Sequence, residues 1–441
     1  MSTIFALATA PGRAGVAVLR LSGPAARTAL SALAGSVPPP RHAQYARFRD
    51  PASGEIIDDG LALFFAGPRS FTGEDVAELQ VHGSRAVVRA LIDALAGLPG
   101  LRLAEPGEFT RRAFENGKLD LTAAEGVADL VAAETMAQRR QAQRQLAGDL
   151  GRLYESWRER LLRGLARLEA EIDFPEEGLP SNLWCDFASD IRDIVCEVAR
   201  HLADNHRGER LREGVAIAII GPPNAGKSSL MNALARRDVA ITSATAGTTR
   251  DVIEVALDLG GYPVVLADTA GLRASADPIE VEGVQRAEAR AANADLRLLV
   301  VDANTPEEVP GLAGMVGADT LVIANKIDLG GDAGWADRLG MGTAMRLSVL
   351  SGIGMPELLE RLHAEVARRF APGHAPVITR ARHREALIDC LAALRRFGAA
   401  RLPELATEDL RMATRCLGRI TGRVGVEDML DLLFREFCIG K

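Results

Sequence analysis

The sequence predicts a multidomain fold in which an α+β domain comes first, an all-α helical domain follows, and an α/β domain is inserted into the helical one. Residues 1–117 mix short apolar runs with glycine and proline, whereas apolar residues in 118–212 and 373–441 recur with helical spacing. Between the two helical segments, residues 213–372 alternate strand-like runs with helical stretches, as parallel βαβ units do. A chain of 441 residues is also long enough for about three domains.

The N-terminal α+β prediction depends on three strand-like runs. They cover residues 15–21, 61–65 and 76–81, and glycine or proline punctuates the sequence between them, including the prolines at 38–40.

The helical prediction for residues 118–212 depends on an apolar stripe. Apolar residues recur at intervals of three or four from Leu146 to Ile172, which predicts one long amphipathic helix. The opposite face is rich in arginine, and we expect it to be solvated, with RNA contact as the alternative. The arginines of this face are Arg139, Arg140, Arg144, Arg158, Arg160 and Arg163. Helical periodicity resumes after a loop-like segment at 371–376 and continues almost to the end of the chain.

Composition limits the kinds of protein that the chain can be. Its 47% hydrophobic and 25% charged residues are typical of a globular protein in water, and its net charge of −7 argues against a surface that coats nucleic acid. No apolar stretch approaches the roughly 18 residues of a membrane span, and the N-terminus lacks a basic segment followed by an apolar run. We therefore expect a cytoplasmic protein without a membrane-embedded part.

The cysteines predict neither a metal site nor a disulfide framework. Their number is odd, and no two of them stand at the short spacing of metal ligands, so reduced thiols are expected. The five are Cys185, Cys196, Cys390, Cys416 and Cys438.

Only four of the 52 basic residues are lysines. Most surface positions accept either lysine or arginine, so a bias toward arginine spares lysine where a compact ammonium on a flexible stem is needed. Each lysine is therefore a candidate functional residue, with chance survival as the alternative. The four are Lys118, Lys227, Lys326 and Lys441.

A phosphate-binding motif follows the apolar run at 215–220. Residues 221–228 read GPPNAGKS, which matches the G-x-x-x-x-G-K-[ST] pattern between a strand and a helix. In that setting glycines let backbone N–H groups surround a phosphate, Lys227 adds a positive charge, and the Ser228 hydroxyl can ligate Mg²⁺. The predicted nucleotide-contacting residues here are Gly221, Asn224, Ala225, Gly226, Lys227, Ser228 and Ser229.

Two further segments complete the predicted phosphate and metal site. Thr249, in the AGTTRD sequence at 246–251, is placed to close over the γ-phosphate and Mg²⁺. The sequence DTAG follows the strand-like YPVVLA and puts an acid beside the metal and a glycine N–H near the γ-phosphate. Its residues are Asp268, Thr269, Ala270 and Gly271.

The nucleotide base is predicted to be guanine. Asp328, in the NKID sequence at 325–328, can accept hydrogen bonds from the N1–H and the amino group of guanine, a donor pair that adenine lacks. Asn325 belongs to the same motif, Lys326 would lie along the base with its aliphatic stem, and Ser348 would complete the pocket. Together with the phosphate motifs, this pattern predicts a P-loop GTPase domain.

Hydrolysis needs a group that orients the attacking water, and the usual one is missing. Small regulatory GTPases place glutamine directly after DTAG, but Leu272 occupies that position here. Glu280 and Glu282 are the nearby candidates, and this reasoning leaves both open. Asn224 could help to hold a monovalent cation at the phosphates, with an ordinary loop residue as the alternative.

With these motifs, the sequence resembles the MnmE (TrmE) family of tRNA modification GTPases along its whole length. The similar segments include TIFALAT, PGRAGVAVLRLSG, FTGEDVAELQVHG, PGEFTRRAFENGKLDL, EIDFPEE, the GTPase motifs and the terminal FCIGK. The ending Cys-x-Gly-Lys on a GTPase is particularly specific. The resemblance implies a homodimer joined through its N-terminal domains, each subunit with a GTPase domain inserted into the helical domain.

The resemblance also implies that K⁺ stimulates GTP hydrolysis when two GTPase domains meet. It assigns K⁺ contacts to Asn224 and to the loop that contains Ser243, Thr245 and Thr248, a loop that departs mildly from the family's threonine-rich form. It favours Glu280, twelve residues after Asp268 as in the family, as the group that orients the water through a bridging water.

The family works with an FAD-binding partner, MnmG (GidA), on the wobble uridine of certain tRNAs. The resemblance implies that an aminomethyl or carboxymethylaminomethyl group is installed on carbon 5, with its one-carbon unit from 5,10-methylene-tetrahydrofolate, for which 5-formyl-tetrahydrofolate is a bound analogue. By resemblance the folate contacts are Arg20, Glu78, Lys118 and Lys441. A carboxylate suits the N–H groups of a pterin ring, and cations suit the glutamate tail.

Cys438 stands fourth from the end of the sequence, where a prenylation box is an alternative interpretation. Glycine and lysine at the last two positions fit that box badly. The resemblance places the terminal tail beside the folate site, where Lys441 and Arg20 would favour a thiolate. We therefore predict that Cys438 takes part in the modification chemistry, as a nucleophile or in acid–base catalysis.

A second class of function is a ribosome-assembly GTPase that binds rRNA as a switch without covalent chemistry. Such a protein usually carries a basic RNA-binding module. This chain is acidic overall and ends in a helical domain with Cys438 and Lys441, which favours the first interpretation.

Overall fold

The computed structural model describes most of the chain, namely residues 2–173, 182–236, 254–268, 293–305, 316–331, 333–338, 340–370, 373, 375–399, 402–425, 427–435, 437 and 440. The chain forms two compact units, each described here by itself. The first contains residues 1–128, 145–191 and 392–441, and the second contains 129–144 and 192–391.

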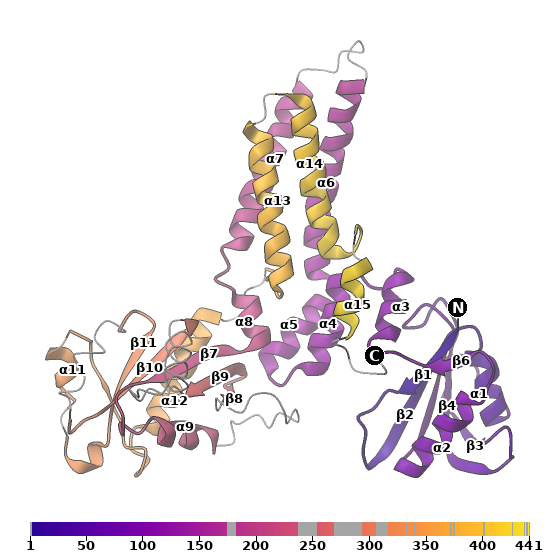
Figure 1. Cartoon of the computed structure of the whole chain (residues 1–441), viewed down its shortest axis with the longest axis horizontal. Helices are drawn as coiled ribbons and strands as arrows, with labels where there is room; N and C mark the ends of the chain where they lie inside the picture. The colour runs from indigo at the N-terminus through magenta and orange to yellow at the C-terminus, as the bar shows by residue number, and fades with distance from the viewer. Residues whose placement is uncertain are drawn as a thin grey trace, which may run out of the picture. The chain divides into compact units, whose positions relative to one another are not determined.

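The first unit begins with a six-stranded sheet in the order β3-β4-β5-β2-β1-β6 (Figure 1). Its neighbours are antiparallel except β1 and β6, which run parallel. The strands are β1 (Thr3–Leu7), β2 (Ala14–Ser22), β3 (Gln44–Arg49), β4 (Ile56–Phe65), β5 (Val76–Gly83) and β6 (Leu101–Leu103). The three strand-like runs expected from the sequence therefore lie within β2, β4 and β5.

One face of this sheet is the core of the N-terminal region. Alternate strand residues such as Leu19, Phe64 and Leu79 are buried against α1 (Ala26–Ala34) and α2 (Arg85–Ala96). Burial of each such side chain contributes about 1.5–3 kcal/mol. Because side chains alternate along a strand, Arg20 and Glu78 lie on the opposite face.

Helix α3 (Glu108–Glu115) follows the sheet, and Gly107 caps its N-terminus with a φ of 70°. A Cβ at Gly107 would lie 3.0 Å from the Cβ atoms of Phe434 and Phe437. Gly107 therefore permits close packing of the C-terminal segment, which includes α15 (Glu427–Arg435), against the start of α3.

The long helix predicted from Leu146 to Ile172 is wrong at its N-terminal end. Leu146 ends α5 (Met136–Leu146), and a new helix, α6 (Asp149–Asp173), carries the rest of the stripe. Gly148 lies between them with a φ of 84°, a left-handed conformation that commonly terminates helices.

Within the first unit, α6 packs against α14 (Pro403–Thr421). Each helix buries residues three or four positions apart, including Tyr154 and Trp157 of α6 and Ala413 and Leu417 of α14. Three further described helices are α4 (Leu121–Ala132), α7 (Asn182–Leu202) and α13 (Ala381–Ala399) (Figure 1). Among the described helices, none is long and apolar enough to cross a membrane.

The arginine-rich face of this region is partly engaged within the protein. Arg160 pairs with Asp190, and Arg158 pairs with Glu155. In the second unit, Arg144 donates to the carbonyl of Gly373 at 2.8 Å. These three arginines therefore have intramolecular roles that the sequence pattern does not predict.

The second unit contains a six-stranded sheet in the order β12-β11-β10-β7-β9-β8. All neighbours are parallel except β8, which is antiparallel to β9. The strands are β7 (Val215–Ile220), β8 (Glu254–Leu259), β9 (Tyr262–Asp268), β10 (Leu296–Asp302), β11 (Thr320–Asn325) and β12 (Met345–Arg346).

Helices cover both faces of the second sheet, as the βαβ pattern predicts. Ile217 and Ile219 of β7 belong to a core cluster with α9 (Lys227–Ala235) and α12 (Met355–Phe370). Ala218 and Ile220 point to the other face and belong to a cluster with Trp335 of α11 (Trp335–Arg338). The remaining helical elements are α8 (Arg207–Glu213), which leads into β7, and the short 3-10 helix η4 (Ile327–Leu329).

Candidate functional site

The predicted phosphate loop connects β7 to α9, and two glycines decide its shape. Gly221 has a φ of 144°, and a Cβ there would overlap the carbonyl oxygen of Val300. Gly226 has a φ of 99° and caps α9, and a Cβ there would overlap the side-chain amide of Asn325. The loop thus forms a cradle that side chains at these positions would fill, and its N–H groups lie at a helix N-terminus suited to an anion.

Lys227 begins α9 and is only 8% exposed. Its Nζ donates to the carbonyl oxygens of Gly221 at 3.0 Å and Pro222 at 2.7 Å. These contacts hold the ammonium group over the loop. Ser228 and Ser229 follow in the first turn of α9 and are exposed, whereas Ala225 is buried beneath the loop.

Asn224 also has an unusual backbone, with a φ of 61°. Asparagine tolerates this left-handed conformation better than most residues. Asn224 is exposed, so its side-chain amide faces solvent at the rim of the phosphate loop.

Asn325, at the end of β11, joins the phosphate loop to the predicted base loop. Its side chain is 2% exposed, and its Nδ2 donates to the carbonyl of Ala225 at 2.8 Å. Its Oδ1 accepts from the N–H of Val349 at 3.2 Å. Two motifs that lie 100 residues apart in the sequence are therefore in direct contact.

Lys326 follows with a φ of 63°, and its Nζ lies 2.8 Å from Oδ2 of Asp302 at the end of β10. Burial opposes the charge of Asp302, but hydrogen bonds from Lys326 and Asn304 outweigh it and lower the pKa of Asp302. Asp302 belongs to none of the motifs recognised in the sequence. Its position at the end of a strand beside β11 could have identified it as a site residue, because the carboxyl ends of parallel strands meet at one edge of the sheet.

Asp328 and Ser348 occupy different environments at the same edge. Asp328 lies in η4 and is exposed, which leaves its carboxylate open to a ligand. Ser348 is fully buried, and its Oγ accepts from the N–H of Ser351 at 3.2 Å. This bond shapes the loop in which Val349 contacts Asn325.

Several predicted residues lie outside the described part of the chain. They are Ser243, Thr245, Thr248, Thr249, Thr269, Ala270, Gly271, Glu280, Cys438 and Lys441. The backbone of Asp268 is described at the end of β9, where it pairs with Ile219 of β7. This pairing places the backbone of Asp268 at the same sheet edge as the phosphate loop.

A second polar site lies on the face of the N-terminal sheet opposite α1 and α2. Arg20 of β2 and Glu78 of β5 are cross-strand neighbours, with Nη2 of Arg20 2.9 Å from Oε1 of Glu78. The guanidinium also lies 5.9 Å from the ring centroid of Phe71 and 6.0 Å from that of Phe109. The structure thus brings together two residues that lie 58 positions apart in the sequence.

Lys118 and Gly440 contact two different parts of the N-terminal region, the loop between β4 and β5 and the strand β1. Nζ of Lys118 donates to the carbonyl of Pro68 at 3.0 Å, which places the amine on the loop between β4 and β5. Gly440 is buried, and a Cβ there would overlap the carbonyl oxygen of Leu7. Leu7 pairs with Leu19, the residue before Arg20, so Gly440 lies against the sheet near the Arg20 position.

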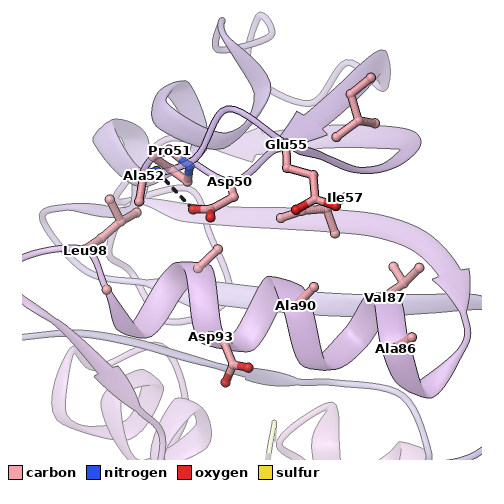
Figure 2. A pocket seen from close by; sticks show the side chains of 13 residues that line it. Asp50, Pro51, Ala52, Glu55, Ile57, Ala86, Val87, Ala90, Asp93 and Leu98 are labelled. Atoms are coloured by element: carbon pink, nitrogen blue, oxygen red, sulfur yellow. Dashed lines mark hydrogen bonds between the residues drawn. The ribbon is translucent and has the colours of Figure 1, made fainter.

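A separate hollow of about 510 Å³ lies between α2 and the turn that joins β3 to β4. Figure 2 shows residues that line it. Ile57, Val87 and Ala90 contribute apolar surface, with acidic side chains around them. Two of these carboxylates are engaged locally: Asp50 accepts from the N–H of Ala52, and Asp93 pairs with Arg89. None of the predicted site residues lines this hollow. Within the described residues, no group of three or more His, Cys, Asp or Glu side chains could hold a metal ion.

Comparison with known families agrees with this arrangement. A model described as the GTP-binding protein TrmE N-terminus matches residues 3–118. A model of the MnmE helical domain matches residues 121–438, a span that includes the second sheet.

Curated relatives match the whole chain. The protein of Parvibaculum lavamentivorans is 57% identical over 452 residues, covering 100% of both chains. That of Paramagnetospirillum magneticum is 57% identical over 441 residues, covering 100% of this chain and 99% of the relative. Both are named tRNA modification GTPase MnmE.

Among solved structures, the G domain of the FeoB iron transporter of T. maritima is 25% identical and covers 35% of this chain and 98% of its own. The TM-score is 0.28. The full-length relatives and the two family models decide the assignment. The chain belongs to the MnmE family of tRNA modification GTPases.

Proposed function

We propose that this chain is a GTPase that acts in tRNA modification, with GTP bound between the phosphate loop and the base loop. The observation that carries the proposal is Asn325, whose buried amide joins the two loops at Ala225 and Val349. A nucleotide needs both loops at once, because its phosphates and its base lie at opposite ends of the molecule.

The described residues fit that ligand. The glycine cradle presents backbone N–H groups to the phosphates, and Lys227 adds a charge beside them. The exposed carboxylate of Asp328 can accept from the N1–H and amino group of guanine. Mg²⁺, when bound, would neutralise charge on the β and γ phosphates, and the hydroxyls of Ser228 and Thr249 would hold it.

The base assignment can be tested by exchanging the hydrogen-bonding character of Asp328. In Asp328→Asn the amide can donate to the 2-oxo group of xanthine, so affinity should move from GTP to XTP by about 100-fold or more. Fluorescent-nucleotide titrations would measure both affinities. Unchanged GTP affinity would remove Asp328 from the base pocket.

We further propose that K⁺ stimulates hydrolysis at this site. Asn224 supports it, because its exposed side chain stands on the phosphate loop where a cation could meet the phosphates. By family resemblance the other contacts come from Ser243, Thr245 and Thr248. Replacing K⁺ with Na⁺ should lower the rate greatly, and Asn224→Ala should remove that difference; equal wild-type rates in both salts contradict the proposal.

Glu280 is proposed to orient the attacking water through a bridging water. The support is the apolar side chain of Leu272 in the usual glutamine position, together with the family spacing from Asp268. Glu280→Gln should slow hydrolysis and leave GTP affinity unchanged, whereas Glu282→Gln serves as the matched control.

The N-terminal site is proposed to bind a tetrahydrofolate. Glu78 offers a carboxylate to the N–H groups of a pterin, and Arg20, Lys118 and Lys441 offer cations to the glutamate tail. The folate, when bound, would supply a one-carbon unit. By family resemblance a homodimer acts with an FAD-binding MnmG-type partner on carbon 5 of the wobble uridine of tRNA, in the cytoplasm.

Cys438 is proposed to take part in that modification. The support is its position two residues before Gly440, which is seated against Leu7 near the Arg20 strand. Cys438→Ser should abolish tRNA modification and spare GTP hydrolysis. A variant with full modification activity would contradict the role.

Reconstitution tests the whole proposal. The chain is combined with its FAD partner, GTP, K⁺, 5,10-methylene-tetrahydrofolate and tRNA, and nucleosides are analysed for the substituted uridine. A wobble uridine that is unchanged in cells lacking the gene would instead favour the ribosome-assembly interpretation.

A further inference from the structure

The loop between β4 and β5, residues 66–75, covers the end of β2 on the sheet face that carries Arg20 and Glu78. It is closed on itself: the N–H of Gly67 donates to the Asp75 carboxylate at 2.9 Å, and the hydroxyl of Ser70 donates to the carbonyl of Glu74. We call residues 66–75 the covering loop. It carries Phe71, whose ring lies beside the guanidinium of Arg20.

Arg112 of α3 joins the covering loop to the sheet through a buried ion-pair network. Its side chain is 9% exposed, and its Nη1 lies 3.0 Å from Oε2 and 3.2 Å from Oε1 of Glu74. Its Nη2 donates to Oε1 of Glu108 at 3.0 Å. Nη1 also lies 3.4 Å from the carbonyl of Ser22, the last residue of β2. One guanidinium therefore connects the loop, the strand and its own helix.

Ser22 and Thr72 extend this network. The Ser22 hydroxyl donates to Oε2 of Glu74 at 2.6 Å and lies 2.7 Å from the hydroxyl of Thr72. Both hydroxyls are fully buried. The carboxylate of Glu74 thus has charged and neutral donors, as a buried carboxylate requires.

The network touches each element that surrounds Arg20. Ser22 is two residues after Arg20 on the same strand and therefore on the same face. Phe109, beside the Arg20 guanidinium, is three residues before Arg112 and lies on the same side of α3. Phe71 belongs to the loop that Glu74 anchors.

Lys118 depends on the same loop. A Cβ on Gly73 would lie 3.1 Å from Cβ of Asn116 and 3.5 Å from the Cγ and Cδ atoms of Lys118. The stem of Lys118 therefore lies against Gly73, and its Nζ donates to the carbonyl of Pro68. A shift of the covering loop would displace this amine together with Phe71.

We propose that Arg112 is a positioning residue for the Arg20 and Glu78 site: by bridging Glu74 and Glu108 it holds the covering loop so that Phe71 and Lys118 are in place for the ligand. This inference rests on the proposed folate function. Arg112 itself does not contact the ligand. Arginine is required because its planar fork reaches two carboxylates at once, whereas a lysine ammonium on the same helix would satisfy only part of the network.

The test compares Arg112→Lys with Arg111→Lys in the full chain. Arg111 is its neighbour on α3, is 36% exposed, and pairs with Glu115 and Asp431 instead. Calorimetric titration with 5-formyl-tetrahydrofolate should show about a tenfold or greater loss of affinity for Arg112→Lys, because misplacing a binding group is costly. Arg111→Lys should stay within about twofold of the wild type, because the charge of a partly exposed pair is kept.

Hydrogen exchange separates positioning from a merely structural role. In Arg112→Lys, amides of the covering loop should exchange faster while those of β1, β2 and β5 keep wild-type rates. GTP hydrolysis should be unchanged in both variants. Faster exchange throughout the sheet would show that Arg112 only maintains the fold, and would overturn the proposal.

The outcomes distinguish this inference from the function on which it rests. Failure of the wild type to bind the folate analogue would reject the folate assignment. Wild-type binding with equal affinity in Arg112→Lys would reject only the positioning role. A tenfold loss confined to Arg112→Lys, with an intact sheet and a loosened covering loop, is the result expected.

Discussion

The nucleotide site and the N-terminal site differ in the chemical groups that form them. The phosphate loop is made by backbone, and its shape depends on Gly221 and Gly226, which have no side chain to fill the cradle. The N-terminal site is made by side chains, with Arg20 and Glu78 paired across two strands and Arg112 bridging carboxylates behind them.

This difference predicts which kind of substitution disrupts each site. A backbone site fails when a carbon atom is added, because the neighbouring carbonyl of Val300 cannot move without disturbing β10. A side-chain site fails when a charge is removed, because the partner is left without compensation. Four predictions compare the two sites and the units that contain them, in order of decreasing expected effect.

The largest effect is expected from Gly221→Ala. The added Cβ would overlap the carbonyl of Val300, and the φ of 144° is unfavourable for alanine. GTP affinity should fall by more than about 1000-fold, measured by fluorescent-nucleotide titration. Gly317→Ala is the control, because a Cβ there meets no atom within 4 Å. Near-normal GTP affinity of Gly221→Ala would contradict a phosphate loop whose shape depends on the absence of a side chain.

The next effect is expected from Arg20→Ala. Loss of the guanidinium leaves Glu78 unpaired and removes a cation from the proposed folate site, so affinity for 5-formyl-tetrahydrofolate should fall by about 100-fold. Calorimetry measures it, and GTP hydrolysis should be unaffected. Arg47→Ala is the matched control, since Arg47 pairs with Asp59 on the same sheet at 2.8 Å but is half exposed. Equal losses of folate-analogue affinity in Arg20→Ala and Arg47→Ala would contradict a specific role of Arg20 in binding.

The third prediction concerns the stability of the two units at acidic pH. Burial lowers the pKa of His201 to about 4, with Arg384 and His383 adding to the effect and Asp204 opposing it. The unfolded chain binds a proton at the ordinary value of 6.5, so the second unit loses stability as the pH falls from 6.5 toward 4. At about pH 5 the loss should be on the order of 2 kcal/mol.

The first unit should respond at lower pH. Burial opposes ionisation of Glu108, but hydrogen bonds from Arg102, the Glu105 N–H and Arg112 outweigh it, so its pKa lies below the ordinary 4.5. The stability that Glu108 contributes is present above that value and is lost only as the pH falls through the lowered pKa.

Urea titrations at pH 7 and pH 5, followed by pulse hydrogen exchange at a fixed pulse pH, measure the two units separately. His201→Gln should flatten the response of the second unit, whereas the exposed His42→Gln should not. Equal acid sensitivity of both units in the wild type would contradict the assignment to His201.

The smallest effect is expected from Asp302→Asn. The substitution removes the charge that holds Nζ of Lys326 at 2.8 Å, so GTP affinity should fall by about tenfold without loss of the fold. Asp319→Asn is the control, because the half-exposed Asp319 pairs with Arg369 in the same unit, away from Lys326. Unchanged GTP affinity in Asp302→Asn would mean that Lys326 needs no support from β10.

Much of the nucleotide site was predictable because its motifs are local. A glycine loop between a strand and a helix, and polar residues after a parallel strand, are adjacent in sequence and in space. The contact between Asn325 and Ala225 was not predictable in its atomic form, since it depends on the order of the strands. The break at Gly148 was missed because the apolar spacing continues across it, whereas the backbone turns at a left-handed glycine.

The N-terminal site was predictable only in part. Arg20, Glu78 and Lys118 were identified by resemblance, whereas Arg112 and Glu74 were missed. They lie 38 residues apart, and neither stands in a motif whose chemistry is readable from spacing. Ion pairs across separate elements depend on register and helix orientation, which a linear pattern does not contain.

By itself, the sequence determined the multidomain layout, the phosphate-loop and NKID motifs and the family. These features depend on local backbone preference, periodicity and residues that must be neighbours in the chain. Only the tertiary structure decided that Asn325 joins two loops, that Asp302 supports Lys326, and that Arg112 bridges Glu74 and Glu108. Burial and hydrogen bonding between distant segments give those side chains their roles, and both exist only once the chain has folded.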